Sequence, residues 1–97
     1  MLLTDSHITS MTNNLITFSN GYIFEATTVD GAVNGDIITM KGLFRTFPRM
    51  ILSPWYFDNK MNMTLIYKPL NDVNKFVIYS SLGDGVAFNF DYIAFGH

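Results

Sequence analysis

The sequence predicts an all-β fold, a small antiparallel barrel or sandwich of about six or seven strands with hairpin and meander connections and at most one short helix. Short runs rich in β-branched and aromatic residues alternate with glycine-containing turn signals, and no long segment keeps a helical period. The 97 residues suit one small β domain spanning 1–97.

The N-terminal third predicts a hairpin that follows a loose arm. Residues 1–13 show no period and are expected to form that arm. Residues 14–28 form two β-rich runs around Asn20-Gly21, a pair typical of a type I′ turn, which would place Phe18 opposite Ile23. Residues 29–35 are expected to be a loop or paired tight turns, and residues 36–42 a third strand.

Residues 43–54 are compatible with two structures. The apolar residues fall at helical spacing, but Pro48 interrupts them, and a proline inside a helix costs about 3 kcal/mol. A strand tolerates Pro48 only at an edge or a bulge. We therefore expect an irregular edge segment, with a short helix beginning near Pro48 as the alternative.

The C-terminal part predicts a three-stranded meander with one apolar face. Residues 61–68 alternate between apolar and polar positions. Residues 75–95 predict a hairpin around Gly83-Asp84-Gly85, with Ile78 opposite Phe90 in the buried face.

The composition indicates a chain with few charges to cover its surface. Hydrophobic residues make up 48% of the chain and charged residues 14%, against roughly 25% charged in an average globular protein. Cysteine is absent, which excludes disulfides and thiolate metal sites. No apolar run is long enough for a transmembrane helix, and the first residues lack the pattern of a signal peptide, so we expect a cytoplasmic protein without a membrane partner.

Motifs for catalysis or cofactor binding are incomplete. Gly83-Asp84-Gly85 lacks the third glycine of a dinucleotide fingerprint, since Phe88 stands there, and no helix is expected to follow. The acidic and amide residues of 30–36 do not match a calcium loop, because Lys41 stands where the bidentate glutamate belongs. Neither His7 nor His97 has a cysteine or a second histidine nearby in the sequence. We expect no enzyme activity, no metal and no cofactor.

Glu25 is an acidic residue in an apolar run. The predicted hairpin register places it on one face with Ile16, Phe18 and Ile23. We expect it at the solvated rim. If it is buried, it needs a partner such as an arginine and would line a pocket.

A basic and aromatic segment suggests an anionic ligand. Residues 41–75 hold all six basic residues and only two acidic ones. Basic groups beside aromatic rings are typical of single-stranded nucleic-acid platforms. The candidates for nucleic-acid or other anion binding are Lys41, Arg45, Arg49, Trp55 and Tyr56.

The outward face of the C-terminal meander is more apolar than a solvated face requires. Its candidates for partner binding are Tyr79, Phe95, Ile93 and Asp91. The leading hypothesis is a non-catalytic interaction module that binds a protein partner stoichiometrically, as an inhibitor, adaptor or structural subunit, and self-associates through a sheet face or edge. The alternatives are a single-stranded nucleic-acid-binding barrel and a small-ligand-binding barrel.

Overall fold

The structure, a computed structural model, describes residues 10–54 and 63–97. In these two ranges the chain forms seven strands and no helix, which confirms the all-β fold. The strands are β1 (Ser10–Thr17), β2 (Ile23–Ala32), β3 (Asp36–Thr39), β4 (Arg49–Pro54), β5 (Leu65–Pro69), β6 (Lys75–Ser80) and β7 (Phe88–Gly96).

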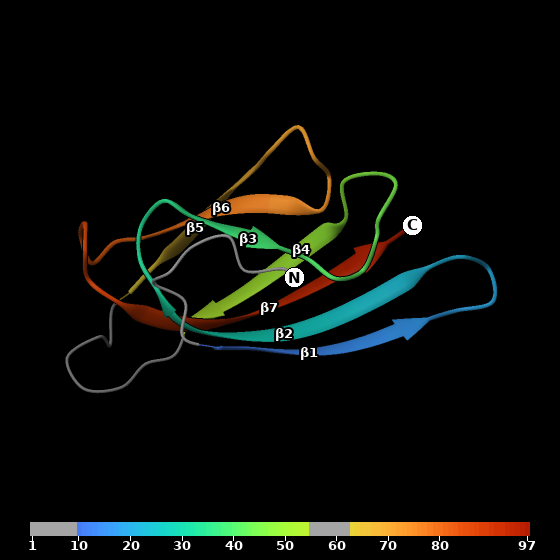
Figure 1. Cartoon of the computed structure of the whole chain (residues 1–97), viewed down its shortest axis with the longest axis horizontal. Helices are drawn as coiled ribbons and strands as arrows, with labels where there is room; N and C mark the ends of the chain where they lie inside the picture. The colour runs from blue at the N-terminus through green and yellow to red at the C-terminus, as the bar shows by residue number, and fades with distance from the viewer. Residues whose placement is uncertain (1–9, 55–62) are drawn as a thin grey trace.

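The strands build two antiparallel sheets, one with the order β1-β2-β7-β4 and the other with the order β3-β6-β5. Figure 1 shows the sheets as two layers, with the β1–β2 hairpin extending beyond the second layer. Neither sheet closes on itself, so the described strands form an open sandwich.

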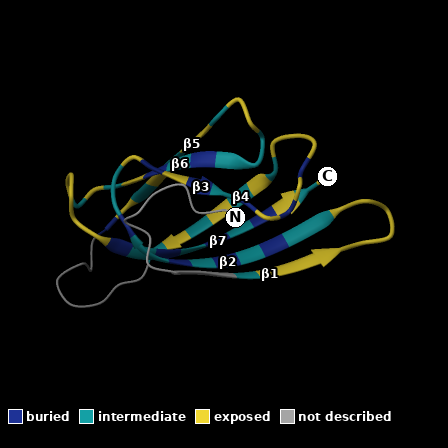
Figure 2. Ribbon diagram, viewed as in Figure 1, coloured by how far each residue is buried: buried dark blue, intermediate teal, exposed yellow. Residues whose placement is uncertain are grey.

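The core lies between the two layers. Every second residue of β7 points into it, from Phe88 through Phe90 and Tyr92 to Ala94. The Phe76 ring of β6 meets the Tyr92 ring edge-on, with centroids 5.3 Å apart and an interplanar angle of 86°, so this aromatic pair joins the two sheets. Figure 2 shows the buried positions on the strands and the exposed β1–β2 turn.

The first hairpin is confirmed, but its predicted register is wrong by one residue. Thr17 lies opposite Ile23, and the Phe18 N–H donates to the Tyr22 carbonyl at 2.7 Å. The Gly21 N–H donates to the Phe18 carbonyl at 3.0 Å, and Gly21 has a φ of 89°. This is a three-residue loop, in which a type I turn is followed by one left-handed residue, so only Gly21 needs a positive φ.

Two further boundaries differ from expectation. Residues 10–13 belong to β1 and pair with β2, so the predicted arm is wrong there, and residues 1–9 lie outside the described residues. The strand β2 continues to Ala32 through a bulge, where the Gly31 N–H donates to Asn89 Oδ1 at 2.9 Å. The turn predicted over 29–35 is therefore shorter, because the bulge lets β2 bend without ending.

The predicted C-terminal hairpin is wrong in its pairing. β6 pairs with β3 and β5, whereas β7 pairs with β2 and β4, and residues 81–87 cross between the sheets. Ile78 and Phe90 are both buried, as expected, but they belong to opposite layers. Alternation correctly identified the inward faces of β6 and β7. It does not identify the neighbouring strand, because both layers present apolar residues to the same core.

Residues 49–54 form β4, an edge strand that begins after Pro48 and ends at Pro54. Of the two structures expected for 43–54, the edge segment is the one observed. The third strand is also confirmed, although β3 ends at Thr39.

Candidate interaction surface

The outer face of the four-stranded sheet is a continuous surface built from alternate residues of four strands. Because β7 lies between β2 and β4, its outward residues occupy the centre. Cross-strand pairing arranges the face in rows, which from β1 to β4 read Ile16–Phe24–Phe95–Arg49, then Asn14–Ala26–Ile93–Ile51, and then Thr28–Asp91–Ser53 from β2 onwards. We call this set the outer sheet face.

Two of the three rows are mainly apolar and accessible to solvent. Ile51 exposes 59% of its surface and Phe95 39%, and Ile16 is exposed at the far side. Along a strand of an antiparallel sheet, the residues that face solvent are normally polar. Contiguous exposed apolar groups with a polar rim are typical of an interaction surface.

The polar end of the outer sheet face is ordered by hydrogen bonds within the chain. The Thr28 hydroxyl donates to Asp91 Oδ1 at 2.7 Å. One row further, Asn89 Oδ1 accepts the Gly31 N–H in the bulge of β2. Asp91 therefore has a structural partner across the strands, and its carboxylate marks the acidic end of the face.

The opposite end of the face combines arginine with aromatic rings. A cleft of about 210 Å³ opens there, and its lining includes Arg49, Phe47, Tyr22 and Phe95. The Tyr22 ring lies against the His97 ring, with centroids 4.9 Å apart. Tyrosine, arginine and other large side chains that converge on one cleft are typical of the residues that dominate protein interfaces.

The segment between β3 and β4 is anchored at three places. Glu25 Oε1 accepts the Lys41 N–H at 2.9 Å, Asn74 Oδ1 accepts the Phe44 N–H at 2.7 Å, and the His97 carbonyl accepts the Thr46 N–H at 3.1 Å. This segment holds Leu43 at a φ of 56° with 77% of its surface exposed. A left-handed, non-glycine residue is unfavourable by itself, so the anchors maintain this conformation.

A second cleft, of about 360 Å³, lies beside the first one. Leu43, Arg45 and Ile23 contribute to its lining, and His97 lines both clefts. Arg45 and Arg49 therefore border two adjacent clefts that meet at His97.

Glu25 is fully buried, so the prediction that it lies at the rim is wrong. Its Oε2 accepts hydrogen bonds from the Tyr92 hydroxyl at 2.6 Å, the Thr27 hydroxyl at 2.7 Å and Asn13 Nδ2 at 3.2 Å. No arginine is needed, because hydroxyl, amide and backbone donors surround the carboxylate. Burial and then the charge of Glu25 raise the pKa of Tyr92 above its usual range.

The neighbours predicted for Glu25 are partly wrong. The observed register puts it opposite Leu15, and Ile16 lies on the other face of the sheet, opposite Phe24. Glu25 does not line either of the two clefts at His97.

The predicted partner-binding residues divide between the two sheets. Phe95, Ile93 and Asp91 lie together on the outer sheet face, but Tyr79 lies on β6, on the outside of the other sheet and opposite Ile66. The separation follows from the placement of β6 and β7 in different layers.

Only some of the predicted anion-binding residues lie close together in the structure. Arg45 and Arg49 border the clefts, whereas Lys41 lies at the start of the anchored segment and lines neither cleft. Trp55 and Tyr56 lie outside the described residues. Three residues of this surface, Ile51, Tyr22 and His97, were not predicted from the sequence to belong to it. The alternation of 49–53 is the signal that identifies Ile51 as outward, once those residues are taken as a strand.

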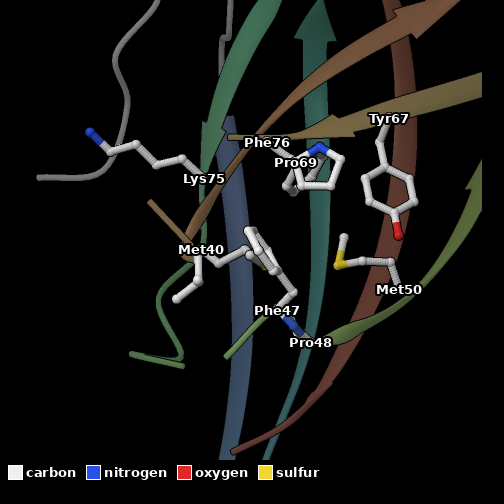
Figure 3. A pocket seen from close by; sticks show the side chains of 9 residues that line it. Met40, Phe47, Pro48, Met50, Tyr67, Pro69, Lys75 and Phe76 are labelled. Carbon is white, nitrogen blue, oxygen red and sulfur yellow. The ribbon is translucent and has the colours of Figure 1, made fainter. Parts of the chain in front are cut away.

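A small apolar cavity of about 40 Å³ lies between β4 and β5. Met50, Tyr67 and Phe76 are among its lining residues, and Lys75 directs its amine away from them (Figure 3). Small-molecule sites usually measure several hundred Å³, so this cavity has room for little more than one small group.

Among the described residues, no group of three or more histidine or acidic side chains is placed to hold a metal ion. The same residues include no helix that could cross a lipid bilayer. No protein-family model, curated protein or solved structure matches this chain at a significant level.

Proposed function

We propose that this domain is a non-catalytic module that binds a protein partner through the outer sheet face. The observation that carries the proposal is the pair of exposed apolar rows centred on Ile93, Phe95 and Ile51. Burying such rows against a partner removes apolar surface from water, at roughly 25 cal/mol per Å². Binding would be stoichiometric, with no chemical step.

The two ends of the face define the chemistry of the partner. Asp91 marks one end and Arg49 the other, with the apolar rows between them. A complementary protein surface would present apolar side chains at its centre, a carboxylate near Arg49 and a hydrogen-bond donor near Asp91. The cleft beside Arg49, with Tyr22 and Phe47 at its walls, would take an anchoring side chain of the partner.

The first prediction uses a matched pair of double variants. The face variant combines Ile51→Lys with Phe95→Glu. The control variant combines Ile66→Lys with Tyr79→Glu on the outside of the other sheet, where the original side chains are 68% and 39% exposed. Both variants introduce one positive and one negative charge. We expect the face variant to lower recovery of the bound partner at least tenfold, which corresponds to about 1.4 kcal/mol of binding free energy.

The measurement is quantitative co-purification from the expressing cells with the wild type and both variants, alongside thermal melts. Equal recovery with the face variant and the control variant contradicts the proposal. Unfolding of the face variant alone also contradicts it, because the outer sheet face would then be part of a covered core.

A second candidate function is binding of single-stranded nucleic acid at the two clefts. The observation that favours it is the position of Arg49 among the exposed rings of Tyr22, Phe47 and Phe95. This function requires that a labelled oligonucleotide bind with an affinity that falls steeply with salt, since counterion release drives such binding. Arg49→Ala should then reduce that salt dependence.

A further inference from the structure

The strand β1 forms one edge of the four-stranded sheet, and the register with β2 determines which of its backbone groups face outward. The Phe18 N–H bonds to the Tyr22 carbonyl, so even-numbered residues of β1 direct their backbone groups towards β2. Asn13, Leu15 and Thr17 consequently direct their N–H and C=O groups away from β2.

The four sheet edges differ in their protection against further pairing. β4 contains Arg49 and ends at Pro54, β5 ends in Lys68 and Pro69, and β3 has only four residues. Proline, charge and short length are the usual means by which edge strands avoid pairing with other chains. β1 has eight residues, of which none is charged and none is proline. Among the edges of the described sheets, β1 is the one without these features.

We propose that β1 is a dimerisation edge, at which β1 of a second copy pairs antiparallel across a two-fold axis. In this arrangement odd-numbered residues of one copy face odd-numbered residues of the other, so their outward donors and acceptors satisfy each other reciprocally. A register centred on Leu15 sets Leu15 opposite Leu15 of the second copy, and Asn13 opposite Thr17.

A second copy fits this edge better than an arbitrary strand for two reasons. A symmetric pair opposes each residue with its own kind or with another residue of the same strand, and an uncharged strand avoids like-charge repulsion in that arrangement. Leu15 and Ile16 are exposed apolar residues on opposite faces of β1, so the second copy offers apolar surface on both faces at the same level.

The dimer would contain one continuous sheet of eight strands. The two outer sheet faces would then lie side by side on one surface, and the assembly would offer its partner two sites. This pairing uses the edge rather than the face, so it is independent of the proposed function.

The test measures the mass of the full chain by light scattering with two variants of one residue. Leu15→Pro removes an outward N–H without taking a bond from the β1–β2 ladder, and Leu15→Lys sets two ammonium groups against each other at the axis. We expect the wild type at about twice 11.0 kDa and both variants at 11.0 kDa. Ile66→Lys and the face variant should keep the dimer mass.

Three results would overturn the inference: a wild type that remains monomeric up to about 1 mM, a dimer that survives Leu15→Lys, or a dimer lost in the face variant. If Leu15→Pro fails to fold, Leu15→Lys decides the question. In a monomeric wild type, slow amide exchange at Leu15 and Thr17 would show that the chain itself covers the edge.

Discussion

Glu25 shows how a single residue links the four-stranded sheet to the segment that borders the clefts. Its carboxylate accepts hydrogen bonds from Tyr92 on β7 and from the Lys41 N–H at the start of the anchored segment. A hydrogen bond to a charged group contributes roughly 1.5–3 kcal/mol to stability. Glu25 therefore fixes where residues 41–47 leave the sandwich, and so where Leu43 and Arg45 are presented.

Tyr92 makes the stability of the fold depend on pH in the alkaline range. Because burial and Glu25 raise its pKa in the folded state above the ordinary value of about 10, its contribution to stability is intact below pH 10 and is lost as the pH rises beyond it. Between pH 9 and pH 11 we expect the free energy of unfolding to fall by about 1.4 kcal/mol more in the wild type than in Tyr92→Phe. Urea melts at pH 9 to 11 measure the difference. Equal slopes would mean that Tyr92 ionises freely in the fold.

At the scale of one element, the β1–β2 hairpin shows that local sequence signals predict the turn but not the length of its loop. Asn20-Gly21 correctly predicts a turn between two strands. The pair does not decide between a two-residue and a three-residue loop, because both place glycine at a positive φ. The Asn20 side chain accepts the Tyr22 N–H at 3.0 Å, a bond that favours the longer loop. The one-residue difference moved Ile16 to the outer sheet face.

The loop provides a prediction about hairpin stability. Gly21 has a φ of 89° with open space around it, so a new side chain would meet backbone strain and no collision. We expect Gly21→Val to cost about 1–2 kcal/mol or more, and Gly21→Asn to cost less, since asparagine tolerates left-handed backbone. Denaturant melts that rank the two variants equally would contradict the observed loop geometry.

Over the whole molecule, the sequence predicts the all-β fold and the inward faces of β6 and β7, but not that these two strands lie in different sheets. The alternation of 88–94 identifies the buried residues, since burial follows the period of a strand. The choice between a hairpin and a crossover at 81–87 depends on long-range packing, which leaves no local signal. The outer sheet face was half predicted for the same reason: Phe95, Ile93 and Asp91 share a strand, whereas Ile51 and Ile16 join them only through the sheet order.

The position of β7 between β2 and β4 brings the apolar rows together on one face, so the binding surface depends on this strand order. The chain has no cysteine, so paired substitutions can test it by disulfide formation. Thr28 and Asp91 are opposite each other on β2 and β7, with side chains hydrogen-bonded at 2.7 Å. A hairpin of β6 and β7 with Ile78 opposite Phe90 would instead set Val77 opposite Asp91.

The decisive measurement is the disulfide content, by mass spectrometry after mild oxidation, of two double variants: Thr28→Cys with Asp91→Cys, and Val77→Cys with Asp91→Cys. We expect an intramolecular disulfide in the first variant, since opposed strand residues lie within the range that a disulfide spans. The second variant should keep two free thiols, because its cysteines lie on different sheets. A disulfide in the second variant, with free thiols in the first, would contradict the sheet order and remove the outer sheet face as a binding surface.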